Sequence, residues 1–472
     1  MNKKISPRHI FPIFFFISFS ANGTERNFID TLTEAHPNSD IDAHLSPCVF
    51  GNLPRGVSLQ QTIERILCHD PRTRSTWTQV KIQAALVDVA RAAYYPTIKG
   101  TARLVNGRNT TNYDERNELS SDGRLRKLSN QLNLSWTLFD FGQREAALRE
   151  NLQLLAAANA NQDALLQMYF FSAAQLYYSA LAAQHDLKIS KKITALTANN
   201  LEAAAARYKS GAAALSDWLQ AQTAYSQANV NQIYDAGKFR EAVGVIALRM
   251  GFPPDIPLNL EDDRAPLPSA ELVNDFAALL RQAQQDHPAL AAIRAEIRAK
   301  EAKLDGNRAL GKPILSLTAD FSYAQFNQSQ MGNQDRSERD RAIGLQLSVP
   351  LFDGFRQRSL VSHDLARLEE SKDKLFKEEQ RLSLELWEGY RTLDTETQRL
   401  IQINKLVTQS HQALKVVQGR YNSGIGDMTE LLSALSIYAN AERQKAATMN
   451  VWQITRLKVC QHLGTLGYWN LN

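Results

Sequence analysis

The stretch nearest to a chemical motif is Gly306-Asn-Arg-Ala-Leu-Gly311-Lys312, which spells most of a phosphate-binding loop. Such a loop needs Ser or Thr after the lysine to hold a metal ion, and it joins a strand to a following helix. Here Pro313 follows the lysine, and the segment comes after a helical pattern and before a strand pattern. We therefore expect no nucleotide-binding site.

No other residues are spaced as a known catalytic or metal-binding motif requires. The nine histidines are scattered, and the chain has neither a His-Glu-x-x-His nor a Gly-x-Ser-x-Gly motif. His69 and His287 lie just before Pro71 and Pro288, which suggests a role at helix starts rather than in metal binding. The sequence indicates a protein that is not an enzyme, and it predicts neither a cofactor nor a metal site.

The chain contains an internal duplication. Leu138-Phe139-Asp140 recurs as Leu351-Phe352-Asp353, 213 positions later, and Asp217 is matched by Glu430 at the same offset. A period this long is not that of a solenoid and indicates two domain-sized copies, which we place at residues 59–250 and 272–463. Arg207-Tyr208-x-Ser210-Gly211 also recurs 213 positions later, as Arg420-Tyr421-x-Ser423-Gly424. Pro71 and Pro96 are matched by Pro288 and Pro313, both at an offset of 217.

Length and charge limit the number of domains and the kinds of partner. The 472 residues would suit about three ordinary domains, but the duplication favours two halves of one body. The 54 basic and 49 acidic residues are spread along the chain. A nucleic-acid surface needs clustered Lys and Arg, so we expect no nucleic-acid partner.

The N-terminus is typical of an exported protein. Lys3, Lys4 and Arg8 precede the short apolar run Ile10–Phe19, which predicts a signal peptide over residues 1–22. The alternative is a buried N-terminal helix. No cysteine follows the cleavage region closely, so we expect no lipid anchor. No later run of about 20 apolar residues is present, which leaves a periplasmic protein, a secreted protein or an outer-membrane β-barrel.

The three cysteines are Cys48, Cys68 and Cys460. An exported chain meets an oxidising compartment, so Cys48 and Cys68 could form a disulfide across a short loop. The sequence does not fix the pairing. Cys48 lies in an N-terminal extension that we place at residues 23–58.

Each copy contains two segments with the period-two alternation of strands. Leu132, Leu134 and Trp136 alternate with polar residues in one of them. We expect strands near residues 97–106, 128–139, 314–326 and 342–352, joined by polar loops over Asn106–Lys127 and Asn327–Arg341. About ten residues suffice to cross a bilayer as a tilted strand. A sandwich with one wet face would show the same alternation.

Each strand pair is followed by a proline-free stretch of exceptional length, expected to form helices over residues 141–210 and 354–423. Asp140 and Asp353 stand where N-caps belong, and Gly211 and Gly424 end the helices. Return helices follow at 215–250 and 427–463, with a proline-rich connector at 251–271 and a tail at 464–472. At about 1.5 Å rise per residue each long helix measures roughly 100 Å and needs partners along its length.

The strand count bears on oligomeric state. A transmembrane barrel must close, because an open edge leaves backbone groups unsatisfied in lipid. Four strands are fewer than the roughly eight of the smallest bacterial barrels. One chain therefore cannot close alone, whereas three chains would supply twelve strands.

The chain resembles the outer-membrane efflux and secretion family of which TolC is the best known member. The resemblance spans nearly the whole mature chain and rests on the strand endings and helix turns of both copies, Leu138-Phe139-Asp140, Leu351-Phe352-Asp353, Arg207–Gly211 and Arg420–Gly424. It implies an α+β membrane protein: a trimeric, twelve-stranded outer-membrane β-barrel that continues into a periplasmic α-helical coiled-coil barrel, with the connector and tail forming a belt around the middle.

The resemblance also implies roles for the helix turns. Ser210, Gly211, Leu215, Ser423, Gly424 and Met428 would contact a periplasmic adaptor, and Asp217, Asp427 and Glu430 would line the pore constriction. In a trimer, Glu430 would form an anionic ring that binds cations. The alternative is that Asp217 and Glu430 only stabilise helix N-termini. Gly426 and Ser433 replace an arginine and an aspartate of the family pattern, so we expect Asp427 and Glu430 to pair with basic residues of the neighbouring turn.

These features predict the exit duct of a tripartite export system. The chain would form a homotrimer. Its other partners would be a periplasmic adaptor, an inner-membrane ABC transporter or proton-driven pump, and outer-membrane lipid. The segment Leu59–Pro71, with Cys48 before it, resembles the protein-secreting branch, which favours type I protein secretion. The alternatives are the outer-membrane component of a multidrug efflux pump and a non-transporting structural or adhesive trimer.

Overall fold

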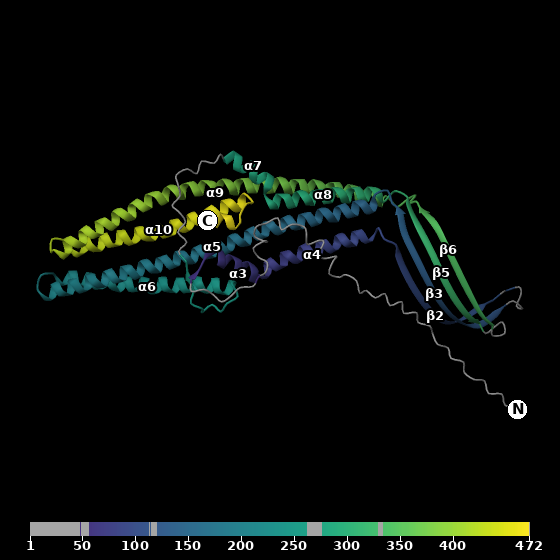
Figure 1. The fold of residues 1–472 in the computed structure, drawn as a ribbon, viewed down its shortest axis with the longest axis horizontal. Coiled ribbons are helices and arrows are strands. Elements are labelled where there is room, and N and C mark those ends of the chain that lie inside the picture. Colours follow the sequence, from purple (N-terminus) through teal and green to yellow (C-terminus); the bar gives the residue numbers. More distant parts are fainter. Residues whose placement is uncertain are drawn as a thin grey trace, which may run out of the picture. The chain divides into compact units, whose positions relative to one another are not determined.

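The computed structural model describes residues 48, 56–112, 114, 120–261, 276–328 and 334–471. The expected signal peptide lies outside these residues, as does part of the proline-rich connector. In each copy two shorter helices precede a pair of long strands, and a very long helix and its return helix follow (Figure 1). No helix among the described residues is both long and apolar enough to span a membrane.

The long strands of both copies form one antiparallel sheet in the order β2-β3-β5-β6. They are β2 (Thr97–Thr111), β3 (Ser121–Phe139), β5 (Ile314–Gln328) and β6 (Gln334–Ser348). The central pair, β3 with β5, joins the two copies, and Leu132 lies opposite Phe321. Leu132, Leu345 and Leu347 share one face, which we call the outward face; Asn133 and Asp320 are hydrogen-bonded to each other on the opposite, inner face.

The strands extend further than expected at the hairpin end. Segments 106–111, 121–127 and 334–341, which were expected to be largely loop, are paired strand. Hydrophobic alternation marks only the part of a strand that meets lipid, whereas the backbone ladder continues wherever both partners are extended. At the other end β6 stops at Ser348, before Pro350, which cannot donate a ladder hydrogen bond.

The aspartates that end the strand motifs do cap the long helices, although neither is the N-cap residue itself. That position is held by Gly142 and Phe355, both with positive φ. Asp140 instead accepts a hydrogen bond from the backbone N–H of Arg144 at 3.0 Å, and Asp353 accepts one from Gln357 at 2.8 Å. Each carboxylate therefore satisfies a free N–H of the first helical turn from outside the helix.

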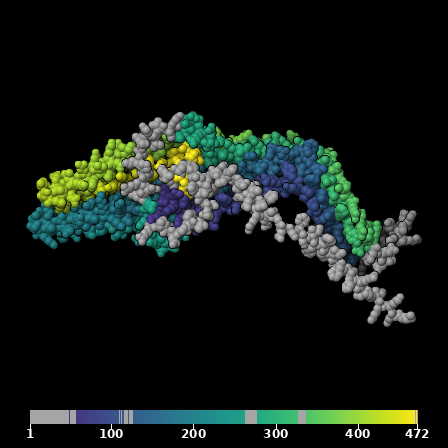
Figure 2. Space-filling model, viewed as in Figure 1, coloured from purple at the N-terminus to yellow at the C-terminus, as the bar shows by residue number. Residues whose placement is uncertain are grey.

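The helices are α3 (Leu59–His69), α4 (Pro71–Ala92), α5 (Gln143–Lys209), α6 (Leu215–Arg249), α7 (Phe276–Asp286), α8 (Pro288–Ala309), α9 (Arg356–Asn422), α10 (Met428–His462) and the 3₁₀ helix η2 (Tyr468–Leu471). They pack as hairpins against one another. α5 packs along α4, α6 and α8, and α9 packs along α8 and α10 (Figures 1 and 2). α10 also contacts α5, so the two hairpins of the duplicated chain lie side by side.

The shorter helices start in different ways in the two copies. His287 is the N-cap of α8, and its Nδ1 accepts a hydrogen bond from Ala289 N at 3.2 Å. In the first copy His69 is instead the last residue of α3, and Asp70 caps α4 by accepting from Arg72 N at 2.9 Å. The expected helix-start role thus holds for His287 but not for His69, because the aspartate occupies the cap.

Two short strands and helix α3 pack around the middle of α5, and we call this group of elements the hub. The two-residue strands β1 (Gly56–Val57) and β4 (Asn259–Leu260) pair in parallel. Gln184 of α5 both donates to and accepts from the backbone of Leu260, at 3.0 and 3.1 Å, which fixes β4 against the long helix.

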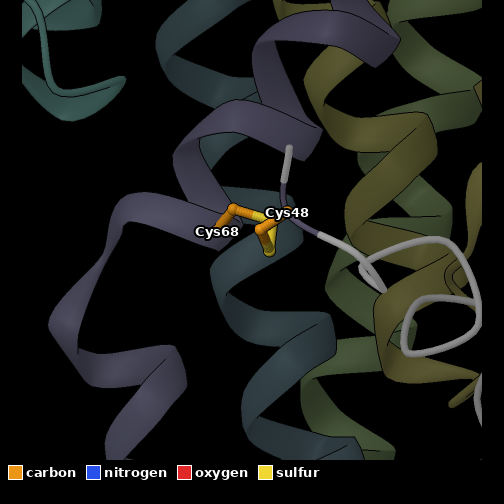
Figure 3. The surroundings of a disulfide bond; sticks show 2 residues. All are labelled: Cys48 and Cys68. Atoms are coloured by element: carbon orange, nitrogen blue, oxygen red, sulfur yellow. A yellow bond between two sulfur atoms is a disulfide. The ribbon is translucent and has the colours of Figure 1, made fainter. Parts of the chain in front are cut away.

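The N-terminal extension is covalently tied to this hub. Cys48 is bonded to Cys68 in the last turn of α3, with the two Cα atoms 5.8 Å apart (Figure 3). One face of α3 is buried: Leu59, Ile63 and Leu67 pack in the same hydrophobic cluster as Phe170 and Tyr177 of α5. The disulfide and the buried face of α3 together anchor the segment that precedes the first copy.

Candidate functional site at the helix turns

Both long helices end in the same glycine turn. Gly211 and Gly424 have φ of 73° and 83°, the left-handed conformation that a residue with a side chain rarely adopts. Behind each glycine the chain closes with paired hydrogen bonds, from Ala212 N to Arg207 O at 2.8 Å and from Ile425 N to Arg420 O at 3.0 Å. These bonds satisfy carbonyl groups at the helix C-terminus, as in a Schellman motif.

The return helices begin differently in the two copies. Asp427 is the N-cap of α10, and its carboxylate accepts a hydrogen bond from Glu430 N at 2.6 Å. Ala214 holds the same place before α6 and makes no side-chain cap. Asp217, in the first turn of α6, accepts from the Ser216 hydroxyl at 3.4 Å, and it forms no ion pair within the described part of the chain.

Glu430 has a cation partner within its own hairpin. Arg420 Nη1 donates to Glu430 Oε1 at 2.7 Å, and both belong to the second hairpin rather than to neighbouring turns. Asp427 is engaged as a helix cap. In the single protomer the end of α9 brings Arg420 over the start of α10, and the expected pairing of these acids with a neighbouring turn stays a prediction.

Arg207 makes a contact between the two hairpins close to the turns. Its Nη1 donates to the backbone carbonyl of Tyr421 at 2.8 Å, and its guanidinium lies 4.9 Å from the centre of the Tyr421 ring. A Cβ on Gly424 would come within 2.9 Å of Arg207 Nη2, so a side chain there would displace the end of the arginine. The repeated Arg-Tyr motif thus makes different contacts in its two copies.

The residues expected to face an adaptor do not behave alike. Ser210, Gly211, Ser423 and Gly424 are exposed, and 47% of the Leu215 surface is exposed. Met428, the counterpart of Leu215, is fully buried in a cluster with Tyr421, Leu431 and Tyr438. Its side chain fills the core of the second hairpin, so the expected adaptor contact of Met428 does not fit this structure.

Further from the turns, a partly buried set of polar side chains links the hairpins. Lys192 of α5 donates to the Tyr438 hydroxyl at 2.5 Å, and that hydroxyl donates to Glu442 at 2.6 Å. Burial, followed by the hydrogen bond to Glu442, raises the pKa of Tyr438. Arg443 reaches Asp235 of α6 at 3.3 Å. The ring of His411 on α9 lies 5.1 Å from that of Tyr438.

Sequence reasoning did not identify Arg207, Arg420 and Tyr421 as a contact network. The signal was present, because the Arg-Tyr pair recurs in both copies at the same distance before the glycine. What the sequence could not show is that one arginine crosses to the other hairpin while its counterpart folds back. No group of three or more His, Cys, Asp or Glu residues in the described part of the chain is arranged to hold a metal ion.

A four-stranded sheet with an apolar face, leading into hairpins of 67- and 35-residue helices, is the protomer architecture of an outer-membrane channel. The family model described as "Outer membrane efflux protein" matches residues 62–249 and 279–465, once in each copy. The chain belongs to this family.

Individual relatives agree with this assignment. Protein CyaE of Bordetella pertussis is 29% identical over 417 residues, which cover 87% of this chain and 85% of CyaE. TolC of Salmonella enteritidis is 22% identical over 89% of this chain and 85% of its own length. The crystal structure of VceC from Vibrio cholerae superposes with a TM-score of 0.70 at 20% identity, covering 86% of this chain and 96% of VceC.

Family membership confirms the expected fold class. The protein is an outer-membrane channel in which three protomers, four strands each, form one β-barrel that continues into a long helical barrel in the periplasm. Channels of this family work with periplasmic adaptors and inner-membrane transporters, so the protein is an exit channel of a tripartite system and not an enzyme.

Proposed function

We propose that this channel is the exit duct of a type I protein secretion system, which passes an unfolded protein from an ABC transporter and its adaptor to the outside. The observation that carries the proposal is the start of the first copy. Leu59–Pro71 resembles the protein-secreting branch of the family. Most of this segment forms helix α3, which has one buried face and is bonded through Cys68 to Cys48.

We further propose that the helix turns are the periplasmic end of the duct, with Asp217, Asp427 and Glu430 at its constriction. Three copies of each acid around one axis would repel one another and attract cations. Arg420 offsets part of the charge of Glu430, and Arg207 holds the second hairpin against the first. The duct has no energy source of its own, so a partner must open it.

Adaptor contact is proposed for the exposed turn residues, Ser210, Gly211, Leu215, Ser423 and Gly424. Leu215 and Ile425, which is 75% exposed, offer apolar surface at the two turns. Exposed apolar side chains at the tip would gain free energy by burial against a second protein. Leu215 is exposed whereas its counterpart Met428 is buried, so the two turns would present different surfaces to an adaptor.

The test compares the proteins in the culture medium of the parent strain with those of a strain that lacks this chain. Loss of one or a few large proteins from the medium, with retention in the cells and recovery on complementation, supports protein secretion. An unchanged medium together with new drug sensitivity points to small-molecule efflux. Absence of any conductance in a planar bilayer would favour a structural or adhesive trimer.

A further inference from the structure

Two arginines stand next to each other on the outward face of β6. Arg341 lies directly opposite Phe321 of β5, and Arg339 lies opposite Tyr323. The guanidinium carbons lie 5.8 and 5.6 Å from the centres of these rings, and both arginines are exposed. Each ring therefore supports one guanidinium from its flat side, which leaves the N–H groups at its edge available to another partner.

The face that carries these arginines is the one that meets lipid. Ile343, Leu345 and Leu347 follow Arg341 at alternate positions of β6 and are 77%, 67% and 65% exposed in the single protomer. In a membrane barrel the apolar face points to lipid and the polar face to the lumen. Among strand residues whose side chains the structure describes, all carboxylates lie on the inner face, namely Asp320, Glu338 and Asp340.

The arginines also lie at a definite depth. They belong to the hairpin end of the sheet, away from the helices, and the helices are periplasmic. Along β6, Arg341 lies six residues from Leu347 and Arg339 lies eight residues from it. These separations correspond to about 20 and 27 Å along the strand. At a strand tilt of about 40° they become roughly 16 and 21 Å of height across the membrane. With Leu347 at the lower edge of an apolar band about 25 Å tall, Arg341 and Arg339 lie roughly 9 and 4 Å below its upper edge. From there their long side chains can extend to the headgroups of the outer leaflet.

We propose that Arg339 and Arg341 form a binding site for the phosphate groups of an outer-leaflet glycolipid, of which lipid A is the model. A guanidinium matches phosphate oxygens with two parallel N–H bonds, and two neighbouring guanidinium groups provide charge for a doubly charged headgroup. Phe321 and Tyr323 beneath them offer apolar surface to the acyl chains. β6 is an edge strand, so in the closed barrel the lipid lies at the boundary between protomers.

The proposal goes beyond the export function and does not depend on what the channel exports. Its test uses the purified full-length trimer, stripped of lipid and titrated with diphosphoryl lipid A in mixed micelles, with bound lipid counted by native mass spectrometry. The test variant is Arg339→Gln/Arg341→Gln. The matched control is Arg103→Gln/Arg336→Gln, which removes the same charge from the inner face of the same sheet.

We expect the outward variant to bind lipid A at least about 10-fold more weakly than wild type and the inner variant to bind it as wild type does. Dephosphorylated lipid A should bind wild type no better than it binds the outward variant. Equal binding by the outward variant and wild type, or equal loss in both variants, would overturn the proposal. So would displacement of lipid A by inorganic phosphate at equal concentration, since the site would then be one for the free anion.

Assembly is checked by the survival of the trimer on an unheated detergent gel. If the glutamine variant does not assemble, Arg339→Lys/Arg341→Lys replaces it, because this variant keeps the charge and loses only the planar donor pair. Weaker binding of lipid A by the lysine variant then supports the proposal, and unchanged binding refutes the two-bond phosphate contact.

Discussion

Arg207 at the end of α5 donates to the backbone carbonyl of Tyr421 at the end of α9, although the two residues belong to different copies of the duplicated chain. The contact joins the two helical hairpins close to both glycine turns. Gly424 leaves room for the guanidinium, and the Tyr421 ring supports it. Any outward movement of the second hairpin relative to the first must therefore break this hydrogen bond or carry Arg207 with it.

Replacement of Arg207 by alanine should make the channel open more often. The change removes a charge-assisted hydrogen bond worth about 2 kcal/mol in each protomer. We expect more frequent openings and higher mean conductance of the purified trimer in a planar bilayer, and greater sensitivity of cells to large antibiotics.

Lys209→Ala is the matched control for Arg207, because Lys209 is an exposed cation at the end of the same helix. It should leave the conductance unchanged. If Arg207→Ala and Lys209→Ala behave alike, the contact with Tyr421 does not restrain the turns.

Substitutions at the Arg420–Glu430 pair should change cation block in opposite directions. Glu430→Ala removes a carboxylate from each protomer and should weaken block of the channel by multivalent cations at least about 10-fold. Arg420→Gln takes away the cation that now partners Glu430 at 2.7 Å and should strengthen block. Both are measured as the blocking concentration in planar bilayers; block that does not respond to Glu430→Ala would remove this residue from the constriction.

The sequence predicts much of the architecture because its strongest signals are local. Prolines and glycines bound the helices, so the first long helix, expected at 141–210, is observed at Gln143–Lys209. Strand alternation is also local, but it reports contact with lipid rather than backbone pairing. For that reason the polar ends of the strands, such as residues 334–341, were expected to be loop.

The site was less predictable, because its contacts depend on how the two copies pack. Leu215 and Met428 occupy equivalent places after equivalent turns, yet one is exposed and the other is buried. Arg207 and Arg420 likewise occupy equivalent places and have different partners. A repeated sequence specifies a repeated local structure, whereas the two environments differ because the second hairpin packs against the first.

Removal of the disulfide should destabilise the hub. Closing a loop of 20 residues contributes about 3 kcal/mol in the chain-entropy model. Cys48→Ser/Cys68→Ser should therefore lower the midpoint of thermal unfolding, followed by circular dichroism, and reduction of wild type should have the same effect.

Cys460→Ala is the control for this experiment, because Cys460 is the free cysteine of the described chain and lies in the last turns of α10. Its midpoint should still fall when the protein is reduced. Reduced and oxidised wild-type protein with equal midpoints would show that the bond does not stabilise the hub.

Acid should destabilise the helical part of the protein through His287. Burial, aided by the nearby charges of His462 and Arg381, lowers the pKa of His287 from 6.5 to about 4. Between these values the unfolded chain binds a proton that the folded chain does not, so stability is complete above pH 6.5 and is lost as the pH falls toward 4. The slope for one such group is at most about 1.4 kcal/mol per pH unit in each protomer.

His287→Asn separates this titration from the capping role of the residue. Asparagine is a strong N-cap and can accept the Ala289 N–H bond that His287 now accepts, but it does not titrate. The variant should keep the midpoint of thermal unfolding at pH 7.5 and lose less stability than wild type on acidification to pH 4.5. His363→Asn, at an exposed histidine of α9, should retain the acid sensitivity of wild type.

Other titratable groups lie near His287, namely Glu378, Glu385 and His462. Burial also lowers the pKa of His462. If His287→Asn is as sensitive to acid as wild type, the loss of stability arises from His462 or from the carboxylates and not from His287.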